Sequence, residues 1–258
     1  MTKLLEGKTI VIMGVANERS IAWGVTKSLH NAGADLIFTN RQERSYKKLV
    51  NLLEKHEIEA KLIVSCDVAS DESVQEAFGK IKDEVGTIHG LIHSVAFANR
   101  EELQGEYADT SRDGFLLAQE ISAYSLVAVT RAAKELMTEG GSIVTQTYLG
   151  SERVVPNYNV MGVAKASLEA SVRYLAEDVG KYGIRVNAVS AGPIRTLSAK
   201  GVSGFNEKAS IIEEKAPLRR SIDQDQVGDA TLFFISDLSR GVTGEVLHVD
   251  SGFHIIGG

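Results

Sequence analysis

The sequence predicts an α/β fold in which helices cover both faces of a parallel sheet. Apolar, β-rich segments recur seven times, helix-like segments separate them, and no proline- or serine-rich linker or internal repeat divides the 258 residues. Near-continuous apolar segments are typical of parallel strands that are buried on both faces. Alternation of strands and helices favours right-handed β-α-β crossovers. We therefore expect a single doubly wound, Rossmann-type domain over residues 1–258.

The individual elements follow from this alternation. The expected strands are 9–13, 35–39, 61–65, 90–95, 142–147, 184–189 and 245–249. The expected helices are 21–31, 43–56, 72–84, 112–137, 160–181 and 224–236. Gly33 and Gly86 follow the first and third of these helices, where a left-handed residue commonly ends a helix.

Composition limits the classes of protein that fit the chain. Hydrophobic residues make up 43% and charged residues 24%, which is typical of a globular protein with a substantial core. The net charge of −6, without a long basic stretch, argues against nucleic acid or an anionic membrane surface as the main partner. The single Cys66 cannot form an internal disulfide, and residues 1–8 lack a signal-peptide core. We expect a cytoplasmic protein with no metal and no membrane segment.

The first strand leads into a glycine-containing turn that favours a bound anion. In a doubly wound sheet the first strand-to-helix turn commonly holds a pyrophosphate. Gly14 would allow the tight turn, and Ser20 would cap the helix whose first amides face the anion. Gly24, within the helix, is expected to let it approach the sheet closely. The turn lacks a GxGxxG motif, so an ordinary α/β connection is the alternative.

Residues after the next three strands extend this predicted dinucleotide site. Asp67 can accept from an adenine amino group, with capping of the following turn as its alternative role. Small residues after His93 leave room for a ribose and nicotinamide, while His93 itself is interpreted as a buried structural residue. Arg41 favours a 2′-phosphate and hence NADPH, whereas the nearby Glu43 keeps NADH as an alternative. An exposed arginine at a helix start is the other interpretation of Arg41.

The clearest chemical signal is a tyrosine seven residues before a lysine. The common short-chain dehydrogenase pattern has a serine after the fifth strand and a Tyr-x-x-x-Lys motif on the next helix. Here Tyr148 stands in place of the serine, and the spacing from Tyr158 to Lys165 is three residues longer than in that motif. On one helix the pair would share a face, and the ammonium would favour the phenolate. The longer spacing indicates an oxygen farther from the hydride-accepting carbon than in a ketone, as in an enoyl group. An isolated surface pair is the alternative.

With these residues the chain resembles the bacterial NAD(P)H-dependent enoyl-acyl-carrier-protein reductases, divergent members of the short-chain dehydrogenase/reductase superfamily. The segments that carry the resemblance are 14–24, 114–119, 158–168, 190–197 and 249–253. The resemblance implies reduction of a trans-2-enoyl-acyl-carrier protein to the acyl-carrier protein in type II fatty-acid biosynthesis, by hydride transfer from NAD(P)H. It also implies a homotetramer.

The resemblance implies roles for individual residues. Tyr158 would hydrogen-bond the thioester carbonyl, Lys165 would hold the nicotinamide ribose, and Tyr148 would be a second active-site tyrosine. Ala98 would lie near the substrate. The implied cofactor contacts are Gly14, Ser20, Ile21, Asp67, Val68, Val95, Lys165 and Ile194. Asn40 and Gln42 depart from the family's usual residues, so the preference for NADPH rests on Arg41.

Two further features bear on partners. Small residues in the segment 195–210 predict a lid over the acyl chain, with a plain surface loop as the alternative. The basic residues that could dock an acidic carrier protein near this lid are Arg195, Lys200 and Lys208. The apolar residues that would suit a buried subunit interface are Val246, Val249 and Phe253.

Two other functions remain open at this point. A carbonyl or sugar-alcohol short-chain dehydrogenase is disfavoured because the Tyr-x-x-x-Lys motif is absent. A non-catalytic dinucleotide-binding regulator is disfavoured because Tyr148, Tyr158 and Lys165 are all present.

Overall fold

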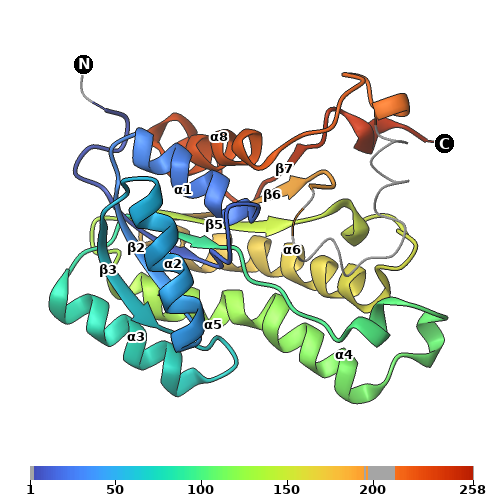
Figure 1. Cartoon of the computed structure of the whole chain (residues 1–258), viewed down its shortest axis with the longest axis horizontal. Coiled ribbons are helices and arrows are strands. Elements are labelled where there is room, and N and C mark those ends of the chain that lie inside the picture. The colour runs from blue at the N-terminus through green and yellow to red at the C-terminus, as the bar shows by residue number, and fades with distance from the viewer. Residues whose placement is uncertain (1–2, 195, 197–212, 258) are drawn as a thin grey trace.

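The computed structural model describes residues 3–194, 196 and 213–257, which contain a seven-stranded parallel sheet (Figure 1). The strands are β1 (Thr9–Met13), β2 (Asp35–Asn40), β3 (Ala60–Ser65), β4 (Gly90–His93), β5 (Gly141–Thr147), β6 (Ile184–Ala191) and β7 (Val246–Val249). They are ordered β3-β2-β1-β4-β5-β6-β7, and each neighbouring pair is parallel. The predicted doubly wound sheet is confirmed.

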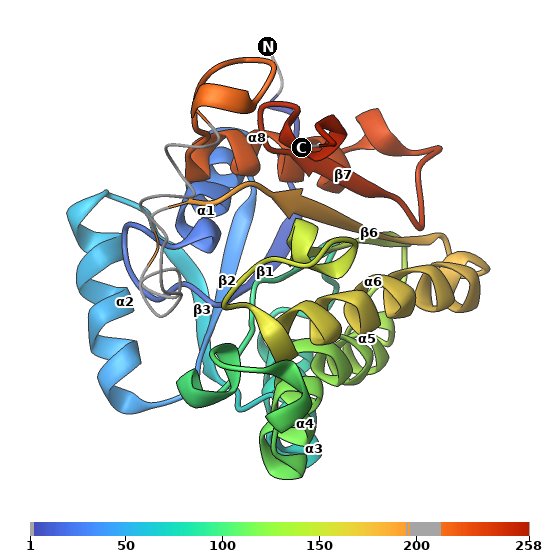
Figure 2. The ribbon, with the colours of Figure 1, turned by 90° about the vertical axis from the view of Figure 1, so that its right-hand side faces the viewer.

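Helices cover both faces of this sheet. One face packs against α1 (Ile21–Asn31), α2 (Glu43–Lys55) and α8 (Gln224–Ile235), and the other against α3 (Asp71–Glu84), α5 (Ser125–Lys134) and α6 (Asn159–Gly180). Figure 2 shows α1 and α8 on one side of the sheet and α3, α5 and α6 on the other. Successive side chains of β1 point to opposite faces, so Ile10 and Ile12 join one core and Val11 and Met13 join the other.

The starts and ends of several helices follow local chemistry. The side chains of Ser70, Ser111 and Asp223 accept hydrogen bonds from backbone N–H groups at the starts of α3, α4 (Arg112–Gln119) and α8. Gly33 and Gly86 have φ angles of +92° and +85°, directly after the cap residues of α1 and α3. Their predicted left-handed conformations are confirmed.

The long helix predicted over residues 112–137 is interrupted. α4 (Arg112–Gln119) leads into a π-helical turn at Glu120–Tyr124, from which α5 continues. The turn brings Ser122 against the loop after β4, where its hydroxyl bonds both the N–H (2.9 Å) and the carbonyl (3.0 Å) of Phe97. Strand β4 ends at His93, two residues earlier than expected, and the residues after it form this loop. The π-helical turn is a tertiary adjustment that helical periodicity did not indicate.

The last crossover has the opposite hand to the one before it. α6 connects β5 to β6 over one face of the sheet, whereas α8 connects β6 to β7, in the same direction, over the other face. The expectation of right-handed crossovers is therefore wrong for β6-α8-β7. Instead of crossing beside α6, α8 lies beside α1 (Figure 1). The connection between β6 and α8 spans residues 192–223, which is long enough to escape the steric preference of short crossovers.

Two glycines allow α1 and α8 to pack closely. A Cβ on Gly24 would lie 2.1 Å from the carbonyl oxygen of Gln224, and a Cβ on Gly228 would lie 2.5 Å from the carbonyl oxygen of Gly24. The expectation that Gly24 permits close approach to the sheet is therefore corrected. Its missing side chain accommodates α8, because α8 covers the same face as α1.

Alanine at two helical glycines should have opposite effects on stability. Gly24→Ala should lower the free energy of unfolding by about 1–3 kcal/mol, because the methyl group meets immobile backbone. Gly79→Ala in α3 should raise it by roughly 0.5–1 kcal/mol, because the methyl group meets no atom within 4 Å and helix propensity improves. Urea denaturation measures both changes. Undiminished stability of the Gly24 variant would contradict the close approach of the two helices.

Candidate active site

Predicted site residues from distant parts of the chain gather at the carboxyl edge of the sheet. Gly14 follows β1, Arg41 follows β2, Asp67 follows β3 and Tyr148 follows β5. The carboxyl ends of parallel strands lie at one edge, where open α/β sheets bind their ligands. The fold therefore brings the predicted nucleotide-binding and chemical residues into one region.

The turn after β1 is pressed against the end of β4. Gly14 has a φ angle of +94°, and a Cβ there would lie 2.0 Å from the carbonyl oxygen of Ser94. Backbone conformation and space both require glycine at this position. The predicted tight turn is confirmed, and its contact with a cofactor stays a prediction.

Ser20 stands at the start of α1 but does not cap it with its side chain. Its hydroxyl donates to the carbonyl oxygen of Asn17 at 2.6 Å, so the predicted side-chain cap is wrong. The side-chain nitrogen of Asn17 is buried without a hydrogen-bond partner, whereas its side-chain oxygen accepts from the Arg19 N–H at 2.8 Å. An unpaired donor beside a helix start without a side-chain cap suits an anion. The turn thus fits the pyrophosphate of a dinucleotide, and Asn17 is a residue that the sequence did not single out.

Arg41 and Asp67 meet where β2 and β3 end. The Arg41 Nε lies 3.4 Å from Asp67 Oδ2, and both side chains are substantially exposed. Asp67 Oδ1 also accepts from the Ala69 N–H at 3.1 Å, so the carboxylate performs the turn-capping role that was its alternative. Its other oxygen, Oδ2, faces Arg41. The Arg41 guanidinium and the Asp67 carboxylate thus lie side by side, where a nucleotide could use one as a cation and the other as a hydrogen-bond acceptor.

The apolar residues of the predicted cofactor site are parts of the surrounding core. Ile194 is buried, and three others pack partly buried against the two main core clusters: Ile21, Val68 and Val95. Ala98 belongs to a third, smaller cluster with Tyr158 and Met161. The predicted substrate contact therefore lies in the same apolar cluster as the predicted oxyanion donor.

His93 is a structural residue, as its sequence context indicated. Its ring is buried, with Nδ1 2.9 Å from Thr145 Oγ1 and Nε2 2.8 Å from Ser125 Oγ. Burial and the positive charge of Lys165 lower the pKa of His93 to about 3. A neutral His93 thus connects β4, β5 and α5 behind the site.

The two site tyrosines pack against each other. The rings of Tyr148 and Tyr158 meet edge to face, with their centroids 5.0 Å apart. Tyr158 immediately precedes α6, between Asn157 and Asn159, which have φ angles of +59° and +25°. The Asn159 side chain donates to the carbonyl oxygen of Gly105 at 3.1 Å. Tyr158 is thus the cap residue of the helix that carries Lys165, with a left-handed residue on each side of it.

Lys165 is a buried ammonium group at the end of β5. Its side chain lies on the buried face of α6, and its Nζ donates to the carbonyl oxygen of Gln146 at 2.7 Å. Burial lowers the pKa of Lys165 to about 8, and the negative charge of Glu169 opposes that effect. Gln146 is a contact that the sequence did not indicate, because it depends on how α6 lies against the sheet, whereas Glu169 lies four residues beyond Lys165 on α6 itself.

Tyr158 stays a neutral phenol in this arrangement. Burial raises the pKa of its hydroxyl well above the ordinary value, and Tyr148 and Glu169 add to the increase. The expectation that Lys165 would favour a phenolate is thus wrong for this structure, in which Lys165 donates to Gln146 instead. A neutral phenol can donate a hydrogen bond to an oxyanion, so the correction leaves Tyr158 suited to its predicted role.

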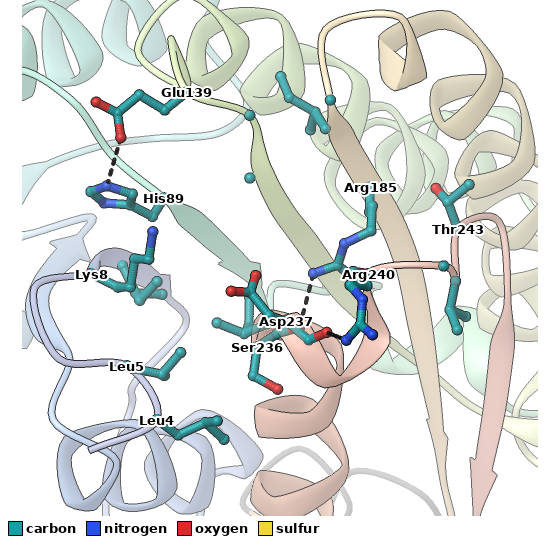
Figure 3. Close-up of a pocket in the computed structure, with 18 of the residues that line it drawn as sticks. Leu4, Leu5, Lys8, His89, Glu139, Arg185, Ser236, Asp237, Arg240 and Thr243 are labelled. Atoms are coloured by element: carbon teal, nitrogen blue, oxygen red, sulfur yellow. Dashed lines mark hydrogen bonds and ion pairs between the residues drawn. The ribbon is translucent and has the colours of Figure 1, made fainter. Parts of the chain in front are cut away.

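A separate cavity of about 460 Å³ lies at the opposite edge of the sheet (Figure 3). Two of its arginines bond carbonyl groups just past the end of α8: Arg185 donates to Ser236 at 3.2 Å and Arg240 donates to Asp237 at 3.3 Å. The carboxyl end of a helix carries partial negative charge, which cations stabilise. These arginines therefore complete a helix end, and the cavity lies at the wrong edge of the sheet to belong to the candidate site.

Some expectations concern other parts of the chain. The predicted lid 195–210, including Arg195, Lys200 and Lys208, lies outside the described residues apart from Thr196. Within the ranges that the structure describes, no group of three or more His, Cys, Asp or Glu side chains is placed to hold a metal ion. In the same ranges, no helix has both the length and the apolar character needed to cross a bilayer.

A doubly wound sheet with these tyrosines and this lysine beyond β5 places the chain among the short-chain dehydrogenases/reductases. A family model described as "Enoyl-(Acyl carrier protein) reductase" matches residues 14–254. The chain therefore belongs to the enoyl-acyl-carrier-protein reductase family. This membership confirms the resemblance seen in the sequence and decides against a carbonyl or sugar-alcohol dehydrogenase.

Individual relatives agree with that assignment. An NADH enoyl-acyl-carrier-protein reductase of Bacillus cereus is 65% identical over 258 residues, covering 99% of this chain and 100% of the relative. An NADPH enzyme of Staphylococcus aureus strain MRSA252 is 61% identical over 252 residues, covering 98% of each. The crystal structure of the Bacillus cereus reductase with NADP⁺ and indole naphthyridinone superposes with a TM-score of 0.97, at 65% identity and 99% coverage of both chains.

Space beside Tyr158 yields a test of the site's geometry. A Cβ on Gly150 would lie 2.5 Å from Cδ1 of the Tyr158 ring, so Gly150→Ala should displace the ring and lower kcat/KM for enoyl reduction roughly 10²-fold. Gly180→Ala, at the end of α6, meets no atom within 4 Å and is the matched control. Steady-state kinetics of both variants check this. Equal activities would show that the position of the Tyr158 ring is unimportant.

Proposed function

We propose that this chain reduces a trans-2-enoyl-acyl-carrier protein to the acyl-carrier protein with NAD(P)H as the hydride donor. Membership of the reductase family supports the reaction. The observation that carries the assignment to residues is the packed pair of Tyr148 and Tyr158 at the end of β5, where the buried Lys165 ammonium bonds the Gln146 carbonyl. A partly buried donor and a buried cation at one sheet edge suit a substrate on which negative charge develops.

The residues of the site have distinct tasks in this reaction. When bound, the reduced dinucleotide supplies the hydride that adds to the β-carbon of the enoyl thioester. Tyr158 donates a hydrogen bond to the thioester oxygen, on which enolate charge develops, until a proton at the α-carbon completes the saturated product. Lys165 binds the ribose hydroxyls and contributes positive charge. Tyr148 holds the Tyr158 ring by edge-to-face packing.

The dinucleotide would lie along the carboxyl edge of the sheet. Gly14, Asn17 and the start of α1 would hold the pyrophosphate, and Asp67 would accept from the adenine. Three features support this placement: the turn that excludes a Cβ, the unpaired side-chain nitrogen of Asn17 and the partly exposed side chain of Asp67. Ile21, Val68, Val95 and Ile194 would provide the apolar walls.

We favour NADPH over NADH as the donor. Arg41 is exposed after β2 and its ion pair with Asp67 is a surface pair, so a 2′-phosphate could recruit the guanidinium at little cost. Glu43 is the residue that would hold the ribose hydroxyls of NADH, and its Oε1 forms an ion pair with Lys47 Nζ at 3.0 Å. The relatives include enzymes named for either cofactor.

The proposed assembly is a homotetramer in the cytoplasm. Support for association comes from β7, an edge strand whose residues are all only partly buried. Exposed apolar side chains on α4 and α6 offer further contact surface, among them Leu116 and Val163. The lone, buried Cys66 agrees with a reducing compartment.

Loss of the Tyr158 hydroxyl tests the proposed chemistry. Tyr158→Phe should lower kcat about 10²–10³-fold because an oxyanion donor is lost, with NADPH affinity nearly unchanged. Tyr174→Phe, on α6 and 81% exposed, is the control. Oxidation of NADPH with crotonyl and acetoacetyl thioesters, followed at 340 nm, measures both the loss and the reaction type. Full turnover by Tyr158→Phe, or preference for acetoacetyl thioester, would contradict the proposal.

Replacement of Arg41 tests the cofactor preference. Arg41→Ala should raise the KM for NADPH about tenfold or more, while the KM for NADH changes less than about twofold, because only NADPH carries the 2′-phosphate. Lys80→Ala, which removes an exposed cation on α3, is the control for general charge effects. Equal changes for the two cofactors would remove the argument for phosphate recognition.

A further inference from the structure

Glu169 is a buried carboxylate in the candidate site that none of the roles above uses. It lies one helical turn beyond Lys165 on α6, and only 7% of its surface is exposed. A buried carboxylate is costly unless hydrogen bonds or a positive charge compensate it. Its surroundings therefore indicate what it does.

One hydrogen bond connects Glu169 to the end of β5. Thr147 Oγ1 donates to Glu169 Oε1 at 2.5 Å. In the chain, Thr147 lies between Gln146, whose carbonyl accepts from Lys165, and Tyr148, which packs on Tyr158. The Glu169 carboxylate thus connects α6 to Thr147, which lies between the residue that bonds Lys165 and the residue that packs on Tyr158.

Among the titratable neighbours of Lys165, Glu169 supplies the negative charge that compensates the buried ammonium. On β4, His93 is neutral because burial lowers its pKa, and beyond β5 burial raises the pKa of Tyr148. Burial also keeps Tyr158 neutral. Glu169 is the carboxylate whose charge raises the pKa of Lys165 against the effect of burial.

A polar cavity lies on the other side of Glu169. It has a volume of about 470 Å³ and carries four further charged or titratable residues among its lining: Glu152, Arg173, Glu245 and His248. Glu152 lies 3.1 Å from His248 Nε2, so these two groups partner each other. Arg173, one turn beyond Glu169 on α6, is exposed and screened by water. Lys165 is not among the residues that line this cavity.

We propose that Glu169 is a positioning residue for Lys165, anchoring the end of β5 through Thr147 and supplying negative charge beside the buried ammonium. This inference rests on the proposed function in that Lys165 serves the reaction. The charge keeps Lys165 protonated to higher pH, and the anchor keeps the Gln146 carbonyl and Tyr148 in place. Without the negative charge of Glu169, Lys165 would lose its proton at a lower pH.

The charge is tested by Glu169→Gln, which retains an acceptor for Thr147. Trace acetylation of Lys165, measured by peptide mass spectrometry from about pH 6 to about pH 11, follows the neutral amine and requires no activity. The midpoint should fall by about one pH unit, so that labelling about one pH unit below the original midpoint rises roughly fivefold. Glu177→Gln, exposed on the same helix, should leave the midpoint unchanged. An unchanged midpoint in Glu169→Gln would overturn the electrostatic role.

The anchor is tested by a pair of substitutions at Thr147. Thr147→Val removes the donor at nearly constant volume and should lower kcat/KM about tenfold or more near pH 7, whereas Thr147→Ser should stay within about twofold. Equal kinetics in the pair would overturn the anchoring role. If the unmodified protein reduces no enoyl thioester, the proposed function fails, while the labelling experiment still decides the inference about Glu169.

Discussion

The hydrogen bond from the Lys165 ammonium to the Gln146 carbonyl joins α6 to the end of β5, and the rest of the site depends on it. A buried ammonium is tolerated only with compensating partners, so helix and strand must keep one relative position. Neighbouring residues of β5 and the residue after it extend the connection through three further pairs: Thr145 with His93, Thr147 with Glu169, and Tyr148 with Tyr158. The end of one strand therefore organises the chemical half of the site.

The nucleotide half depends on a different constraint, the close passage of backbone against backbone. Gly14 meets the Ser94 carbonyl and Gly24 meets the Gln224 carbonyl, and neither position leaves room for a methyl group. The second contact lets α8 pack closely against α1, on the face that gives the last crossover its unusual hand. Glycines thus determine both the turn beneath the expected pyrophosphate and the packing of the helix that begins there.

The sequence predicted the sheet well because its signals are local. Apolar strands, the glycines that end helices and the buried His93 can all be inferred from a few neighbouring residues. Features that depend on contact between distant segments were missed or wrong. Ser20 bonds Asn17 instead of the helix amides, and a π-helical turn interrupts a long amphipathic segment to place Ser122 against Phe97.

By itself, the sequence determined the order of strands and helices, the turn at Gly14 and the set of residues Tyr148, Tyr158 and Lys165 from which the family could be inferred. Only the tertiary structure decided how those residues interact. Tyr158 is the cap residue of α6, its hydroxyl is neutral, and Lys165 contacts the Gln146 carbonyl. The reason is physical: protonation and hydrogen bonding depend on burial and on neighbours across the fold, which spacing along the chain does not specify.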